Sequence, residues 1–159
     1  MDNIDELIKE YWALSPDSPS GLVYIKGRQG SKHKVGDPAC PYLDSKGYYV
    51  GGLGRRTIKA HRAVYFLAHG CWPTYIDHVD GNRQNNNPEN LREVTHLENN
   101  HNRLVRGYYK TRRGKYKAVI RCGGKQVRLG EFSTEDEART AYLIAKKELH
   151  PTAPERCYA

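Results

Sequence analysis

The stretch from residue 77 to residue 102 constrains the fold of this chain more than any other. It opens with an Asp-His pair that closes a short run of β-formers and is followed by an Asp-Gly turn, which indicates a strand ending at the pair. Residues 82–90 contain five asparagines, and asparagine side chains cap loop amides and carbonyls, so we expect an ordered loop. Thr95 and Glu98 match a capping box, which predicts a helix.

Periodicity and turn formers predict the remaining elements of the first hundred residues. They are an amphipathic helix over 3–13, a strand over 21–26, strands over 47–53 and 56–59, a helix over 60–69 closed by Gly70, and antiparallel strands over 75–79 and 91–94. His61 begins the 60–69 helix, and taken alone it is expected to be a hydrogen-bonded structural histidine rather than a metal ligand.

Composition indicates small modules, because only 38% of the 159 residues are apolar. The longest apolar run is 63–68, far short of a membrane span, and residues 1–6 are acidic and lack the basic start of a signal peptide. A cytoplasmic protein is therefore expected. No C-x-x-C pair exists, so we expect free thiols rather than a zinc knuckle or a disulfide framework. The four cysteines are Cys40, Cys71, Cys122 and Cys157.

The net charge of +8 is unevenly distributed. Residues 1–102 hold 12 Lys/Arg and 12 Asp/Glu, whereas residues 103–159 hold 14 Lys/Arg and 6 Asp/Glu. Ten basic residues and no acidic one lie between positions 103 and 128. Such a block indicates a polyanionic partner, nucleic acid before membrane, because solvated surfaces normally mix both signs.

The basic block coincides with a predicted sheet. Residues 107–110 form the expected first strand, and a Gly-Gly turn joins the second strand to a third. In the second strand, Lys115, Lys117 and Arg121 alternate with Tyr116, Ala118 and Ile120, which places the basic and the apolar side chains on opposite faces. Helix 133–149 follows, capped by Ser133 or Thr134. One helix behind three strands leaves a cationic face open, and residues 150–159 are expected to be a tail.

Phosphodiester hydrolysis needs an activated water and a cation that neutralises developing charge. The Asp77 carboxylate and the Asn99 amide oxygen suit a hard cation, and His78 suits the role of base because imidazole titrates near neutral pH. Neighbours on a regular strand point to opposite sides, so Asp77 and His78 can share a site only where the strand twists or ends.

Residues 61–102 resemble the HNH nucleases of the ββα-metal (His-Me finger) class, in their phage and homing-endonuclease branch. The matching pieces are A-H-R-A-V-Y, then I-D-H-V-D-G-N-x-x-N-N, then E-N-L-R-x-V-T-x-x-E-N-N. This resemblance implies an α+β fold. Residues 1–104 would form the nuclease domain, with a ββα-metal core over about 75–104 and extra N-terminal strands and a helix.

The resemblance also implies a role for each site residue. Asp77 corresponds to the first metal ligand and His78 to the general base. Asn90 corresponds to the middle asparagine, which braces the loop and helps orient the base. Asn99, nine residues later, corresponds to the last ligand.

Two neighbouring asparagines, Asn100 and Asn102, are alternatives to Asn99 as the last ligand, and many relatives carry a histidine there. His101 is near but out of register. With no third strong ligand, the resemblance implies one weakly held divalent metal, Mg²⁺ first and Mn²⁺ as the substitute.

Residues 107–149 resemble an ERF/Apetala-type DNA-binding domain, through G-Y-Y-K, K-Y-K-A-V-I, R-L-G-E-F-S-T and E-A-R-T-A-Y. The resemblance implies a domain over 105–159 whose three-stranded sheet lies in the major groove, with Arg112 and Arg113 on phosphates. The remaining implied DNA contacts are Lys115, Lys117, Arg121, Gln126 and Arg128.

The sequence thus predicts a metal-dependent endonuclease or nickase of double-stranded DNA, of phage homing type, acting in the cytoplasm of a bacterial host. A single centre in a monomer would nick one strand, and a double-strand break would need a dimer or re-docking. The alternatives are a non-enzymatic, sequence-specific DNA-binding regulator and an RNA-directed protein. The complete Asp-His-Asn-Asn set argues against the regulator, and the narrow major groove of A-form RNA argues against RNA.

Overall fold

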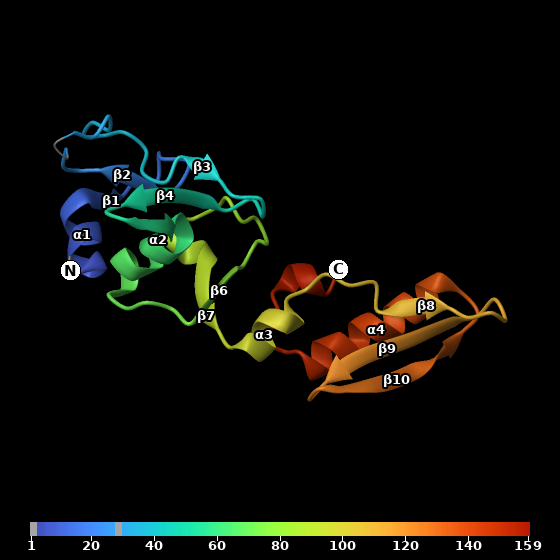
Figure 1. Ribbon diagram of the computed structural model, residues 1–159. Helices are drawn as coiled ribbons and strands as arrows, with labels where there is room; N and C mark the ends of the chain where they lie inside the picture. The colour runs from blue at the N-terminus through green and yellow to red at the C-terminus, as the bar shows by residue number, and fades with distance from the viewer. Residues whose placement is uncertain (1–2, 28–29) are drawn as a thin grey trace. The chain divides into compact units, whose positions relative to one another are not determined.

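A computed structural model describes residues 3–27 and 30–159 of the chain, which divides into two compact units, residues 1–94 and 95–159 (Figure 1). The first two residues of the acidic N-terminal stretch therefore lie outside the described residues. The units divide ten residues before the boundary expected from the sequence, because the helix after the second hairpin strand packs within the C-terminal unit. The assignment of a nuclease domain and a DNA-binding domain remains a prediction.

The N-terminal helix is shorter than its apolar periodicity predicts. Helix α1 spans Ile4–Tyr11, and Trp12 takes extended backbone angles, φ −124° and ψ 144°. Strand β1 (Trp12–Leu14) then pairs antiparallel with β2 (Leu22–Tyr24). The expected helix to residue 13 is therefore wrong at its end, because strand pairing buries the Trp12 indole edge-on against Tyr24.

A small sheet and a helix complete the core of this unit. Strands β3 (Tyr42–Leu43), β4 (Tyr49–Leu53) and β5 (Arg56–Lys59) pair in the order β3-β4-β5. Helix α2 (Ala60–His69) follows and ends at Gly70, whose φ of 75° is the left-handed conformation that glycine adopts without strain. The predicted strands and helix are confirmed, and β3 was missed because it has only two residues. The core is formed chiefly by Ile8, Trp12, Leu22, Val64 and Phe66.

The hairpin expected around the Asp-His pair is confirmed. Strand β6 (Tyr75–His78) pairs antiparallel with β7 (Leu91–Val94), and a short 3-10 helix, η1 (Pro88–Asn90), leads into β7. In the C-terminal unit, helix α3 (His96–His101) begins with the predicted capping box of Thr95 and Glu98.

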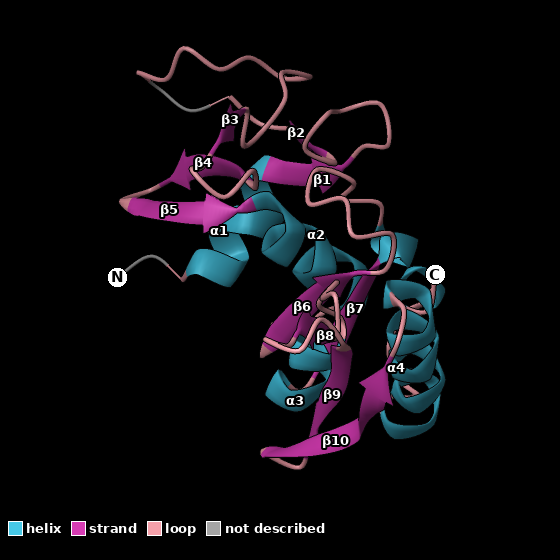
Figure 2. Cartoon of the chain, turned by 90° about the vertical axis from the view of Figure 1, so that its right-hand side faces the viewer, coloured by secondary structure: helices cyan, strands magenta, loops and turns pink. Residues whose placement is uncertain are grey.

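The rest of the C-terminal unit is a three-stranded antiparallel sheet with one helix on its back (Figure 2). The strands are β8 (Tyr108–Lys110), β9 (Tyr116–Cys122) and β10 (Lys125–Phe132), in the order β10-β9-β8. Helix α4 (Glu135–Leu149) packs on them, and Thr134 rather than Ser133 is its N-cap, in a capping box with Glu137. Ala118, Ile120 and Tyr142 are buried between sheet and helix.

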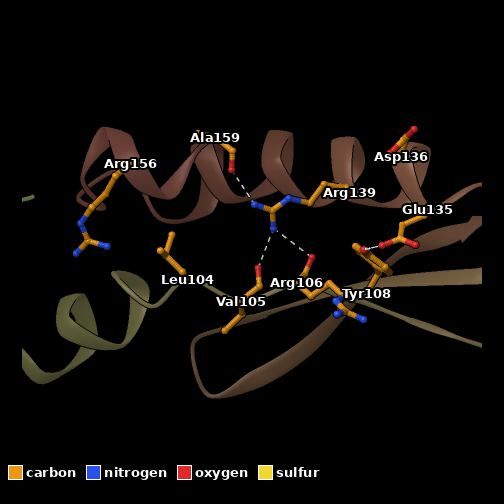
Figure 3. A pocket seen from close by; sticks show the side chains of 9 residues that line it. All are labelled: Leu104, Val105, Arg106, Tyr108, Glu135, Asp136, Arg139, Arg156 and Ala159. Carbon is orange, nitrogen blue, oxygen red and sulfur yellow. Dashed lines mark hydrogen bonds between the residues drawn. The ribbon is translucent and has the colours of Figure 1, made fainter. Parts of the chain in front are cut away.

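The last ten residues are not a free tail. They form a short 3-10 helix, η2 (Glu155–Cys157), and the buried Cys157 thiol donates to the backbone oxygen of Asn102 over 3.2 Å. Arg139 on α4 donates to the backbone oxygens of Val105 (2.8 Å) and Ala159 (2.7 Å), as Figure 3 shows. These contacts tie both the segment before β8 and the end of the chain to α4.

All four cysteines are free thiols, as the sequence predicts. Within the described residues, no helix combines the length and the apolar character that a bilayer span requires.

Candidate functional site

The Asp-His pair forms the last two positions of β6, and both side chains are buried. Asp77 lies opposite Arg92 in the β6–β7 register, and Arg92 Nη2 is 3.2 Å from Asp77 Oδ2. The guanidinium therefore faces the carboxylate across the hairpin, on the strand that follows the asparagine loop. A buried carboxylate requires such a partner, because desolvating an isolated charge is costly.

His78 is held by an asparagine that the sequence did not single out. Asn86 Oδ1 lies 3.2 Å from His78 Nε2, and Asn86 Nδ2 donates to the Ser20 backbone oxygen over 3.0 Å. The bond to Ser20 fixes which end of the amide faces the imidazole, so His78 Nε2 is the donor and Nδ1 carries the lone pair of the neutral ring. Burial lowers the pKa of His78, although the Asn86 hydrogen bond acts in the opposite direction.

A second histidine lies against the first. The His61 ring, from the first turn of α2, has its centroid 5.4 Å from that of His78 and 4.8 Å from that of Tyr48. His61 Nδ1 is buried and has no hydrogen-bond partner among the described residues, so the expected hydrogen-bonded structural role is not met at that atom. Burial, followed by the charge of His78, lowers the pKa of His61 to about 3.

The asparagine loop is ordered by its own side chains, as its composition predicts. Asn90 Oδ1 accepts from the Asp80 backbone N–H (3.0 Å), and Asn90 Nδ2 donates to Asp80 Oδ1 (2.9 Å) and to the Asn85 backbone oxygen (2.8 Å). Partial burial would raise the pKa of Asp80, but hydrogen bonds from Asn85, Asn82 and Asn90 lower it overall. Asn90 thus lies where a loop brace is needed, while the His78 contact comes from Asn86.

Asn99 and its rivals lie on or just after α3, in the C-terminal unit. Asn99 is half-buried, and Asn100 is exposed with its amide 3.3 Å from His96 Nδ1. Asn102 is buried, and its backbone oxygen accepts from Cys157. The ring of His101 stacks on His150 at 3.6 Å, which places that out-of-register histidine within the C-terminal unit. The choice of Asn99 as the last metal ligand remains a prediction.

The donor chemistry suits a hard cation that keeps most of its water. Asp77 supplies one carboxylate, and the described residues contain no group of three or more His, Cys, Asp or Glu side chains placed to hold an ion. Such a set does not suit zinc, which favours nitrogen and sulfur ligands. It suits Mg²⁺, which binds through one or two carboxylates, water and substrate phosphates.

The second group of predicted site residues lies on the C-terminal sheet. The register pairs Gln126 with Arg121 and Arg128 with Val119, and directly paired residues project to the same face. That face is opposite the one that buries Ile120 against α4. The sheet therefore has the predicted face that helix α4 does not cover. We call it the open sheet face. It is formed by Tyr109, Lys117, Val119, Arg121, Gln126, Arg128 and Glu131.

The open sheet face is not uniformly basic. Glu131 lies opposite Lys117 in the register and forms an ion pair with Arg128 over 3.2 Å. Lys117 Nζ also lies 5.9 Å from the centroid of the Tyr109 ring. The other predicted DNA contacts, Arg112, Arg113 and Lys115, are exposed in the turn between β8 and β9.

Comparison with known proteins identifies the class to which this site belongs. Residues 59–101 match the family model described as HNH endonuclease. That range includes α2, the β6–β7 hairpin, α3 and each predicted catalytic or metal residue, so the chain contains an HNH endonuclease domain.

Two curated relatives carry the same kind of name. One is an uncharacterised HNH endonuclease of Acanthamoeba polyphaga mimivirus, 33% identical over 116 residues, which are 68% of this chain and 61% of the relative. The other is the DNA endonuclease I-HmuI of Bacillus phage SP01, 35% identical over 103 residues, which are 63% of this chain and 57% of the relative. The chain thus spans about three fifths of the length of each. No solved structure matches it at a significant level.

Three contacts of the site could not be assigned from the sequence. Asn86 is one of five similar residues in its loop, and only the fold shows that it reaches His78. No sequence signal distinguished Arg92, and only the register of the β6–β7 hairpin shows that it lies opposite Asp77. His61 belongs to A-H-R-A-V-Y, one of the pieces that carry the family resemblance, but its contact with His78 depends on how helix α2 packs.

Proposed function

We propose that this chain is a metal-dependent endonuclease that hydrolyses phosphodiester bonds in double-stranded DNA. The observation that carries the proposal is that the HNH match coincides with a hairpin whose last two β6 residues, Asp77 and His78, are buried and individually held. The names of the relatives, one of them a phage DNA endonuclease, support DNA as the substrate.

In the proposed mechanism His78 Nδ1 accepts a proton from the attacking water. Its lowered pKa keeps the imidazole neutral and able to accept that proton at physiological pH. Asn86 holds the ring through Nε2, and Asn90 holds the loop that carries Asn86. Orientation of this kind makes a large contribution to rate, because the base must lie within hydrogen-bond reach of the water.

Asp77, with Asn99 of α3, would hold the divalent cation, Mg²⁺ first and Mn²⁺ as the substitute. When bound, such a cation stabilises the charge that develops on the phosphate and on the leaving 3′-oxygen. The proposed task of Arg92 is to hold the Asp77 carboxylate in one orientation for that cation.

We further propose that the C-terminal unit is an ERF/Apetala-type module that holds duplex DNA on the open sheet face. The arrangement of three strands with one helix on the back supports this, as does the exposure of Arg121, Gln126 and Arg128. Arg112 and Arg113, in the adjoining turn, are suited to phosphates. The proposed setting is a phage-type element acting in a bacterial cytoplasm, with a monomer cutting one strand per encounter.

The catalytic proposal is tested by incubating the protein with supercoiled plasmid and Mg²⁺, with and without a chelator, beside His78→Ala. Conversion to the nicked form should require the metal and fall about 10²- to 10⁴-fold in the variant, the usual contribution of a general base. Intact plasmid with Mg²⁺, Mn²⁺ and other common divalent ions would refute the enzyme assignment.

The DNA-binding proposal is tested by an Arg121→Gln/Arg128→Gln double variant. Each lost phosphate contact should lower the slope of log affinity against log salt by about one. Lys147→Gln is the control, because Lys147 is exposed near the end of α4 and away from the open sheet face. Equal binding by the double variant and the control would exclude this face as the DNA contact.

A further inference from the structure

The Tyr48 ring joins the candidate base to two basic side chains. Tyr48 precedes β4, and its ring centroid lies 4.8 Å from that of His61 and 6.0 Å from that of His78. Lys59 Nζ lies 4.8 Å from the centroid of the same ring, and the Arg83 guanidinium carbon lies 5.3 Å from it. One aromatic ring thus contacts both histidines and both cations.

The two cations come from separate parts of the N-terminal unit. Lys59 is the last residue of β5, and Arg83 belongs to the asparagine loop. Arg83 Nη1 donates to the Lys46 backbone oxygen over 2.8 Å, which uses one of the five guanidinium donors and fixes the position of the group. Cation–π contact with Tyr48 orders both long side chains before a ligand arrives.

The carboxylate partner of Lys59 is Asp44, whose Oδ2 lies 3.8 Å from Lys59 Nζ. Asp44 Oδ1 is engaged elsewhere, because it accepts from the backbone N–H groups of Lys46 (2.8 Å) and Tyr48 (3.0 Å). Lys59 therefore shares its carboxylate partner with two backbone groups, and Arg83, which forms no ion pair among the described residues, is exposed to solvent.

We propose that Lys59 and Arg83, ordered on Tyr48, form a subsite for a backbone phosphate of the substrate strand beside the bond cleaved at His78. This inference rests on the proposed nuclease function and deepens it. The charge count assigns DNA holding to the C-terminal unit alone, because residues 1–102 are net neutral. The structure instead gathers two positive groups next to the base, where a guanidinium fork and an ammonium suit phosphate oxygens.

The subsite is tested in the full-length protein with Arg83→Gln and Lys59→Gln, measured as kcat/KM on a duplex oligonucleotide over a range of NaCl. Arg55→Gln is the matched control, because Arg55 is an exposed arginine in the β4–β5 turn of the same unit. Each subsite variant should lose about tenfold to a hundredfold in kcat/KM, the usual worth of a charge-assisted hydrogen bond. The salt slope should fall by about one for each variant.

Two further measurements separate binding from structure. Arg83→Lys should recover part of the activity, because it keeps the charge while losing the fork. Tryptophan fluorescence should give the wild-type melting temperature for each variant, since Trp12 and Trp72 both lie in the N-terminal unit. If the wild type cleaves DNA and both glutamine variants behave like Arg55→Gln, the subsite is overturned and the nuclease assignment stands. If the wild type cleaves nothing, the nuclease assignment fails and the subsite fails with it.

Discussion

The predicted catalytic pair of the N-terminal unit and the predicted DNA contacts of the C-terminal sheet differ in burial. In the N-terminal unit, Asp77 and His78 are buried, and each is held by a partner from another segment. In the C-terminal unit, Arg121, Gln126 and Arg128 stand exposed on a sheet whose other face holds the small core. A base needs one orientation and a controlled pKa, which burial supplies. Contact with a polyanion needs reach and net charge, which an exposed surface supplies.

The largest effect should come from a substitution that unfolds the C-terminal unit and leaves the N-terminal unit folded. Gly107 has a φ of 79°, and a Cβ there would lie 2.1 Å from Cγ of the buried Tyr142. Gly107→Ala should therefore cost about 2–5 kcal/mol, from backbone strain and overpacking together. We expect loss of DNA binding and of far-UV circular dichroism signal, with the fluorescence of the N-terminal tryptophans unchanged.

Gly114→Ala is the control for this change, because Gly114 has the same φ of 79° and a Cβ there meets nothing within 4 Å. It should cost only the backbone strain, about 1–2 kcal/mol. Equal stabilities of the two variants would show that Tyr142 does not limit the space at Gly107.

The next effect concerns acid stability of the N-terminal unit. The pKa of His61 is about 3 in the folded chain and about 6.5 when unfolded, so the unfolded state binds more protons between these values. Stability should be fully present above pH 6.5 and decline as pH falls toward 3, by about 2–3 kcal/mol from this group once water penetration is allowed for.

Urea unfolding followed by tryptophan fluorescence at several pH values measures this decline. His61→Phe keeps a ring that does not titrate, so the variant should lose less stability on acidification than the wild type. An identical pH dependence in both proteins would remove His61 as its source.

A smaller effect tests how the base is held. Asn86→Ala removes the partner of His78 Nε2 and should lower kcat about tenfold to a hundredfold, while the Kd for DNA stays unchanged because the open sheet face is intact. Gln84→Ala is the control from the same loop, since Gln84 is exposed. A parallel fall in kcat and in DNA affinity would contradict the division of labour between the two units.

The smallest effect should come from the one carboxylate on the open sheet face. Glu131 pairs with Arg128, so Glu131→Gln should free that guanidinium and tighten DNA binding by up to about fivefold. The gain should disappear in the Arg128→Gln background, as titration of labelled duplex DNA would show. A gain that persists there would mean that Glu131 acts by general repulsion and not through Arg128.

Local signals predicted much of this fold. The box of Thr95 and Glu98 begins α3, Gly70 ends α2, and the alternation in β9 identifies its buried and exposed faces. These features were readable because caps and periodicity depend on residues only a few positions apart. Prediction failed where a local pattern met a distant partner, as at Trp12, whose helical spacing yields to pairing with Tyr24.

The residue types of the site, their order along the hairpin and the concentration of positive charge after residue 102 can all be read from the amino-acid sequence. Only the folded chain shows that Asn86 reaches His78, that Arg92 faces Asp77, and that Tyr48 contacts two cations beside the histidines. Composition and spacing describe neighbours along the chain and do not specify contacts between distant segments. A strand register and the closure of a loop instead select one partner among several chemically equal side chains, and that selection depends on the packing of the whole unit.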